Sequence, residues 1–553
     1  MASFTEEQQR VGKLLRAEFE RDGIHLDKDG RNRIIAYHND ITRLSTQFQR
    51  NIHSNNSYIE VPTKKLRMLP ESLLSQCYKK WNGTTAIPTS VHMTNSVLKW
   101  IRDPEIRKAM YIAGNSSSSA NLEVLDQLIA TRHALACTLG FETYADFATS
   151  DKMIGSPDRV VDFLGNIASK LMKKATMERN LLVQAKTKLE GPSLLSFNNR
   201  QVTLESWDVP YYMGMLKAQA FQLDSRVIAS YFPLEQCLVG LGMIVSELFG
   251  VTFTPVSTME KNETWHPDVR KVLVSKDGVE LGVLYLDLYP RAHKYHHAAH
   301  FTIRCGKQLE NGVYQTPIVA LVCNFNPPES NKPSLLTHGE VETLFHEFGH
   351  ALHSILSRTE FQHLSGTRGQ LDFVETPSHL FEYFCWDERV VQCFARHYET
   401  QAPIPLEMLS NLKRSKHMFS AMETQTQCLY SLLDLELFRH QPLRFSPPTT
   451  TQALKELQNH NTLVPYVEGT HWHARFGHLV GYGAGYYSYL YARVFAAEIW
   501  RACLSSNPWN ADSGRLVYEE LLQHGGAKEP MTMLTSVIGH VPTIDSFVNE
   551  LGV

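Results

Sequence analysis

The chain has 553 residues and a mass of 63.0 kDa, with 43% hydrophobic and 20% charged residues. This length and composition are typical of a folded globular protein with one or two large cores, and they exclude a disordered or fibrous chain. The formal net charge of −3 and the pI of about 6.8 argue against the strongly basic surface of a nucleic-acid-binding protein, so we expect no nucleic-acid partner.

The cysteines and the N-terminus bear on the compartment. The nine cysteines are scattered and include no C-x-x-C pair, which indicates reduced thiols. The apolar run at residues 318–323 is far shorter than the roughly 20 residues of a membrane-spanning helix, so we expect no membrane partner. The chain begins MASFTEE, which is acidic where a transit peptide is Arg-rich, and no targeting segment is visible.

The predicted elements change type twice along the chain. From about residue 5 to residue 253 apolar residues recur at three- and four-residue spacing, which predicts helices. Between about residues 271 and 325 the period becomes two, and Asp277-Gly278 is a hairpin signal, so a small, largely antiparallel sheet is predicted. A loop at 326–333 follows, and helical patterns return up to residue 553, with a linker expected at 444–451.

A metal-binding helix is predicted directly after the sheet. Thr337 and Glu340 have the spacing of a capping box that opens a helix. On that helix the motif H-E-x-x-H places His346 and His350 about one turn apart, so both imidazoles can bind one zinc ion. Glu347 is then placed to act as general base on a zinc-activated water rather than as a ligand.

A catalytic zinc site needs a third protein ligand. The extended motif H-E-x-x-H-x-x-G-x-x-H is excluded because His353 and Leu356 stand where it requires Gly and His. Three downstream carboxylates compete for the role. Glu360 lies in a polar run, whereas Glu375 begins an apolar helical stretch where an unpaired carboxylate would be costly, so Glu375 is preferred over Glu360 and Glu382.

Two more acids flank Glu375 at helical spacing. Histidine ligands usually donate their second ring nitrogen to a carboxylate or carbonyl, so Asp372 and Glu382 are candidate partners of the ligating histidines. An ordinary surface role fits each of them equally well.

Several motifs resemble those of the thimet oligopeptidase family (M3) of zinc metallopeptidases. They are the runs LTHGEVETLFHEFGH at 336–350, DFVETPS at 372–378 and FGHLVGYGAGYYSYL at 476–490. The resemblance implies Glu375 as third zinc ligand. It also implies oxyanion-stabilising roles for His478 and Tyr489, with Tyr486 as a third possibility. The alternative for these tyrosines is a packed aromatic stripe, because Tyr482, Tyr486 and Tyr489 recur at helical spacing.

Candidate substrate-binding residues lie outside the metal-binding motif. We place Tyr482, Tyr289 and Arg291 among the candidate substrate-binding residues, although a charge at a strand end is more often simply solvated. The strand that ends at residues 324–326 is a candidate edge onto which an extended peptide adds by backbone pairing.

The resemblance also gives the expected architecture and activity. The shorter spacing in 476–490, with GGAKEPM at 525–531 and SGTR at 365–368, is similar to the mitochondrial intermediate peptidase branch of the family. We therefore expect a mainly α, two-lobed, zincin-like metallopeptidase with one zinc ion per chain and a deep substrate channel. Residues 1–255 would form an N-terminal helical lobe, and 256–553 a catalytic lobe.

The expected function is removal of N-terminal octapeptides from imported mitochondrial precursor proteins in the matrix, by a monomer that takes unfolded chains or peptides. The alternatives are a general oligopeptidase that degrades short peptides and a non-catalytic peptide-binding homologue. Because members of that branch begin with a targeting segment and further helices, we expect upstream helices to be absent here.

Overall fold

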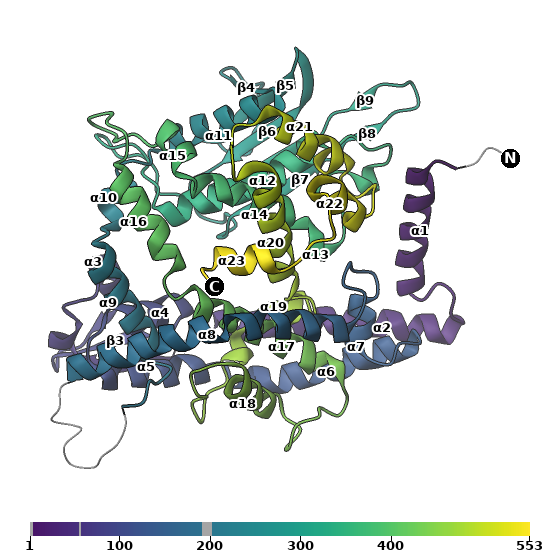
Figure 1. The fold of residues 1–553 in the computed structure, drawn as a ribbon. Helices are drawn as coiled ribbons and strands as arrows, with labels where there is room; N and C mark the ends of the chain where they lie inside the picture. The colour runs from purple at the N-terminus through teal and green to yellow at the C-terminus, as the bar shows by residue number, and fades with distance from the viewer. Residues whose placement is uncertain (1–3, 55–56, 191–201) are drawn as a thin grey trace. The chain divides into compact units, whose positions relative to one another are not determined.

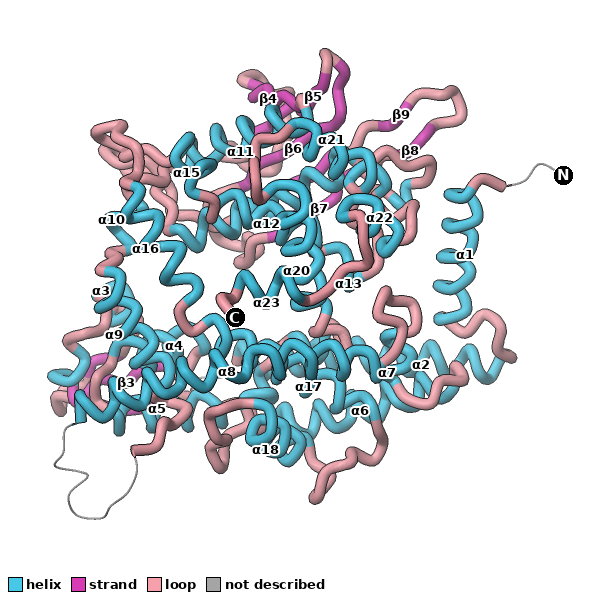
Figure 2. The backbone as a smooth tube through the Cα atoms, viewed as in Figure 1, coloured by secondary structure: helices cyan, strands magenta, loops and turns pink. Residues whose placement is uncertain are grey.

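The computed structural model of the protein describes residues 4–54, 57–190 and 202–553. Helices make up most of its ordered elements, and the few strands are short (Figure 2), which confirms the mainly α prediction. The described residues fall into two compact units: unit 1 draws on Met1–Glu18, Leu223–Ser415 and Ser488–Gly552, and unit 2 on Phe19–Gln222, Lys416–Tyr487 and Val553. Each unit thus combines separate stretches of chain. The division after residue 255 that the sequence suggests stays a prediction.

Unit 2 is built almost entirely of helices (Figure 1). Its elements are α2 (Lys28–His53), β1 (Tyr58–Pro62), α3 (Glu71–Leu74), β2 (Tyr78–Lys79), β3 (Thr84–Pro88), α4 (Val91–Trp100), α5 (Pro104–Ser116), α6 (Ala120–Thr138), α7 (Tyr144–Thr149), α8 (Pro157–Glu190), α9 (Val209–Phe221), α17 (Ser420–Arg439), α18 (Thr450–Asn461) and α19 (His478–Gly481). The long helix α17 packs against α8, so the late segment of chain completes a core that the early helices begin. Most of the predicted linker at 444–451 lies between α17 and α18, within this unit, and its last two residues begin α18.

A small sheet interrupts the helices of unit 2 where the sequence predicts helix alone. Strands β1, β3 and β2 pair antiparallel in that order, and Asn82-Gly83 lies in the turn between β2 and β3. Gly83 has a φ of +79°, which favours glycine. The strands are too short to impose a clear period of two on the sequence.

Unit 1 contains the larger sheet and the metal-binding motif. Its elements are α10 (Ser225–Ala229), α11 (Leu234–Phe249), β4 (Val251–Val256), β5 (Arg270–Lys276), β6 (Val279–Asp287), β7 (Ala299–Arg304), β8 (Lys307–Gln308), β9 (Tyr314–Gln315), β10 (Ile318–Val322), α12 (His338–Leu356), α13 (Leu371–Val374), α14 (Thr376–Glu382), α15 (Glu388–Phe394), α20 (Ser488–Ile499), α21 (Ala511–Glu520), α22 (Pro530–Ile538) and α23 (Asp545–Glu550). Two further helices, α1 (Glu6–Arg21) and α16 (Leu406–His417), run from one unit into the other along the chain.

The five-stranded sheet has the order β4-β5-β6-β10-β7, and only the β6–β10 pair is parallel, which confirms a largely antiparallel sheet. The predicted hairpin at Asp277-Gly278 joins β5 to β6, and both residues have positive φ. The prediction that the strand ending at residues 324–326 forms the sheet edge is wrong. That strand, β10, lies between β6 and β7, where its apolar side chains are buried on both faces. The edge strand on this side of the sheet is β7.

Helix α12 packs against β10, β7 and β6 and carries the metal-binding motif. Thr337 is its N-cap, and Thr337 and Glu340 form the predicted capping box. On its other side α12 meets α14 at Gly349, where an added Cβ would lie 2.7 Å from Ser378 Cα. This close approach lets the two helices share one site. Within the part of the chain that the structure describes, no helix is both long and apolar enough to cross a bilayer.

Candidate active site

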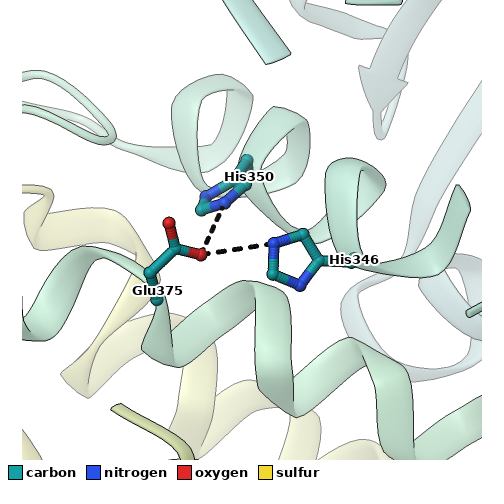
Figure 3. Close-up of side chains that lie close together, drawn as sticks. All are labelled: His346, His350 and Glu375. Carbon is teal, nitrogen blue, oxygen red and sulfur yellow. Dashed lines mark ion pairs between the residues drawn. The ribbon is translucent and has the colours of Figure 1, made fainter. Parts of the chain in front are cut away.

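Helix α12 projects His346 and His350 toward one carboxylate oxygen. His346 Nε2 lies 3.2 Å and His350 Nε2 lies 3.0 Å from Glu375 Oε2 (Figure 3). The two rings are 5.0 Å apart and nearly perpendicular, as expected for residues four apart on a helix that approach a common point. The structure therefore brings together the three residues that the sequence suggests as zinc ligands.

Glu375 stands at the junction of two short helices. It ends α13 and caps α14, and the Ser378 hydroxyl donates to Glu375 Oε2 at 3.0 Å, which fixes the carboxylate. The three potential ligand atoms lie within 4.8 Å of one another. Two imidazole nitrogens and one carboxylate oxygen are a known donor set of catalytic zinc sites, so these residues fit zinc. Glu360 instead accepts a hydrogen bond from Gln8 Nε2 at 3.1 Å.

Glu382 pairs with the other nitrogen of His346. Its Oε1 lies 2.7 Å from His346 Nδ1 and 2.8 Å from His379 Nδ1. A proton on His346 Nδ1 leaves the lone pair of Nε2 available to a metal ion. Asp372, the other predicted partner, is fully buried.

The pKa values follow from this pairing. Burial raises the pKa of the Glu375 and Glu382 carboxyls, but their histidine partners outweigh it and hold both pKa values well below the usual range. Burial likewise opposes protonation of His346, yet the two carboxylates raise its pKa to about 10. The site thus holds one ionised carboxylate against each ring nitrogen of His346.

Glu347 differs from these paired carboxylates. It is buried, and desolvation raises its pKa, while His346 and His350 partly offset the rise. A smaller backbone interaction with His300, in β7, also lowers this pKa. A carboxylate whose pKa is raised toward neutrality is better suited to accept and return a proton than one held strongly acidic.

His379 is a site residue that the sequence reasoning missed. It lies on α14 three residues before Glu382, so both side chains point to one face of the helix. This three-residue spacing of His379 and Glu382 is the feature of the sequence that could have identified His379 as a partner of Glu382. Two further histidines lie near His350: His300 is half-buried and His353 is buried. Desolvation lowers the pKa of each to about 3, so both are neutral.

The residues of the 476–490 segment are divided between the two units. His478 begins α19 in unit 2, where its ring lies 5.8 Å from that of Tyr482 and 5.2 Å from that of Tyr486. Tyr486 is buried and donates its hydroxyl to Gln427 Oε1 at 3.0 Å. Tyr489 is half-buried on α20 in unit 1. Helix α19 ends at Gly481 and α20 begins at Ser488, so the tyrosines do not form a stripe along one helix.

Tyr289 and Arg291 follow the end of β6. Arg291 donates to both carboxylate oxygens of Asp287, at 2.7 and 2.8 Å, and Tyr289 accepts from Arg270 at 3.3 Å. Both side chains thus have protein partners, and a substrate-binding role stays a prediction.

Known proteins resemble this chain along nearly its full length. A mitochondrial intermediate peptidase of Arabidopsis thaliana is 40% identical, and the match covers 99% of this chain and 80% of the relative. The mitochondrial intermediate peptidase of Mus musculus is 37% identical over 100% of this chain and 74% of its own length. The solved structure of PZ peptidase A with an inhibitor shares the fold, with a TM-score of 0.56 and 15% identity over 99% of this chain and 79% of that one.

The family signature covers most of the chain. The model of peptidase family M3 matches residues 97–553, a range that includes α12, Glu375 and the 476–490 segment. The match agrees with the histidine and glutamate geometry described above. The chain belongs to peptidase family M3.

Proposed function

We propose that this protein is a zinc-dependent endopeptidase that removes N-terminal octapeptides from precursor proteins imported into mitochondria. The observation that carries the proposal is the convergence of His346 Nε2 and His350 Nε2 on Glu375 Oε2. The choice of substrate is supported by the relatives named mitochondrial intermediate peptidase, which match over nearly the whole chain.

One zinc ion per chain would be held by His346, His350 and Glu375. Glu382 orients His346 for this role through the Nδ1 hydrogen bond. Bound zinc would polarise the scissile carbonyl and lower the pKa of the attacking water.

Glu347 would act as the general base. Its carboxylate takes a proton from the attacking water and passes it to the leaving amine. Burial keeps the carboxylate away from bulk water.

The free edge of β7 is the best candidate for binding an extended substrate. As the last strand of its sheet, β7 presents backbone donors and acceptors along one side, and most of its side chains are exposed. A peptide that pairs with such an edge is held by main-chain hydrogen bonds with little regard to sequence. This role replaces the one expected for β10.

His478, Tyr489 and Tyr486 are the candidate donors to the oxyanion of the tetrahedral intermediate, and Tyr482 is a candidate substrate contact. Imidazole and phenol groups both supply the required hydrogen bond. Burial lowers the pKa of His478, so its ring is neutral at physiological pH and donates from one nitrogen. We further infer a mitochondrial matrix location from the names of the relatives, and a monomer that binds unfolded chains or peptides.

The test compares two substrates. A precursor intermediate that carries its octapeptide and a set of free short peptides are incubated with the protein, and the products are identified by mass spectrometry. Loss of the octapeptide from the precursor supports the proposal, and Glu347→Gln serves as the matched inactive control. Cleavage of the free peptides alone would favour a general oligopeptidase. Binding of both without cleavage would favour a non-catalytic peptide binder.

A further inference from the structure

Unit 2 contains a cavity that the proposed mechanism does not use. Its volume is about 450 Å³, and its walls come from α4, α5, α9, α17, α18 and the segment that precedes α19. Apolar side chains form most of the lining, including Leu98, Met213, Leu429, Trp472 and Phe476. This size and this lining are typical of a site for a small ligand or for one or two residues of a peptide.

Arg475 supplies a positive charge to this cavity. Its Nη2 donates to Asn115 Oδ1 at 2.8 Å, and its Nη1 makes a long contact of 3.5 Å with the carbonyl oxygen of Thr89. Both acceptors are neutral. A guanidinium carries five N–H donors, so this pairing leaves capacity for a further acceptor.

No carboxylate among the described residues forms an ion pair with Arg475. Burial lowers the pKa of its guanidinium. The neighbouring hydroxyls of Tyr111 and Tyr430 are neutral, because burial raises the pKa of both. The one acid among the described lining residues, Glu423, pairs with Lys217 at 3.2 Å. A half-buried cation without a counter-ion is costly, and this cost is relieved when a ligand supplies the anion.

We propose that this cavity binds the carboxylate of a peptide, with Arg475 pairing the carboxylate and the apolar walls holding a neighbouring apolar side chain. A guanidinium can hold a carboxylate through two parallel hydrogen bonds, which gives both affinity and orientation. The choice of a peptide as the ligand rests on the proposed peptidase function. The carboxylate can be a peptide C-terminus or an acidic side chain, since both offer the same two oxygens.

The cavity is joined to residues with proposed catalytic roles. The Phe476 ring lies 5.0 Å from the His478 ring and 5.1 Å from the Tyr486 ring. Tyr430 contacts Trp472 and Phe476, at 4.8 and 5.2 Å between ring centroids. A ligand that packs on Phe476 therefore contacts the same ring that supports His478, so the site is suited to substrate selection.

Calorimetric titration of the full, zinc-loaded chain carrying Glu347→Gln tests the proposal, because no probe is then hydrolysed. The three probes are acetyl-Ala-Ala-Phe as the free acid, the same peptide as its C-terminal amide, and acetyl-Ala-Glu-Phe-amide. We expect the free acid to bind at least about tenfold more tightly than its amide if the cavity takes a C-terminus. Tight binding of the glutamate peptide would instead identify the side chain as the source.

Asn115→Asp is the sharpest variant. It replaces the amide oxygen at 2.8 Å from Nη2 by a carboxylate oxygen of the same shape, so Arg475 acquires an internal counter-ion. We expect binding of the carboxylate probe to weaken at least about tenfold while the melting temperature stays equal or rises. A purely structural Arg475 predicts the same thermal result with no change in binding.

Arg475→Met should weaken binding to a similar extent. Arg179→Met is the matched control, since Arg179 donates to the carbonyl oxygen of the wall residue Leu463 at 3.1 Å but does not line the cavity. Absence of binding in the parent chain, or equal binding with and without Asn115→Asp and Arg475→Met, would overturn the proposal. Because binding is measured without turnover, this result is independent of whether the protein removes octapeptides.

Discussion

The candidate metal site of unit 1 and the cavity of unit 2 differ in how their charged side chains are paired. Beside α12, Glu375 and Glu382 are each shared by two imidazoles. In unit 2, Arg475 has only neutral partners among the described residues. In the first site every carboxylate has histidine partners, and a bound cation would replace the contacts of Glu375 with His346 and His350. In the second site Arg475 has no anionic partner among the described residues, so a ligand would supply the negative charge.

Removing the proposed base Glu347 should abolish most of the peptidase activity and leave metal binding intact. We expect Glu347→Gln to lower kcat by about 10³ to 10⁴, since general acid–base catalysis contributes factors of this order. Zinc content, measured by elemental analysis, should stay at the wild-type level because Glu347 is not one of the proposed ligands. A variant that keeps wild-type turnover would remove Glu347 from the mechanism.

Glu375→Ala breaks the shared contact itself. Without this carboxylate the two histidines lose their common partner, and we expect zinc affinity to fall by more than about 100-fold, measured by competition with a chelator. Glu360→Ala is the matched control, because Glu360 was the competing candidate and pairs with Gln8. The reverse pattern, in which only Glu360→Ala loses zinc, would identify Glu360 as the third ligand in place of Glu375.

Tyr489→Phe asks whether a residue of α20 takes part in the reaction. We expect kcat to fall by about 10² with little change in KM, by analogy with the loss of other oxyanion donors. Tyr491→Phe, two residues along the same helix, removes a hydroxyl from another half-buried tyrosine and should leave kcat unchanged. Equal kinetics of the two variants would return Tyr489 to a packing role.

Glu382→Gln sharpens the comparison by weakening one pairing without removing a proposed ligand. A glutamine lacks the charge that stabilises both Nδ1–H groups, and we expect zinc affinity to fall by about 10- to 100-fold. His379→Ala should lower zinc affinity by less, because the hydrogen bond between His346 and Glu382 is retained. A larger loss with His379→Ala would show that His379 has a more direct role.

Gly349→Ala probes the close contact between α12 and α14. The new methyl group would lie 2.7 Å from Ser378 Cα, and backbone atoms move only at a cost, so we expect the free energy of unfolding to fall by about 1–3 kcal/mol. Gly339→Ala, at the exposed start of the same helix, meets no atom within 4 Å and should not destabilise the protein. Denaturant titration of the two variants measures the difference, and similar midpoints would contradict the contact.

The residues of the candidate metal site could be predicted because their signals are local. The capping box, the pair of histidines and the Asp277-Gly278 turn each depend on residues only a few positions apart, and local spacing survives in any fold that forms these elements. Glu375 was preferred as third ligand because an unpaired carboxylate in an apolar stretch is costly. The structure places it beside both histidines, and its role as a ligand stays a prediction.

What the sequence could not supply depends on contacts between distant segments. The place of β10 inside the sheet follows from its pairing with β6 and β7, although burial of Val319, Ala320 and Leu321 on alternating faces was already suggested by the unbroken apolar run. The walls around Arg475 come from stretches that begin near residue 91 and end near residue 476, and no local pattern brings them together.

The interleaving of the two units has a consequence for biosynthesis. While a ribosome makes this chain, unit 2 cannot close until α17 and α18 have followed the whole of Leu223–Ser415, and α13 and α14 stay uncovered until α20 emerges to pack on them. Such late, long-range closure makes folding slow and leaves apolar surfaces open to aggregation in the meantime. We therefore expect nascent chains halted before residue 487 to depend on chaperones and to gain protease resistance only after release.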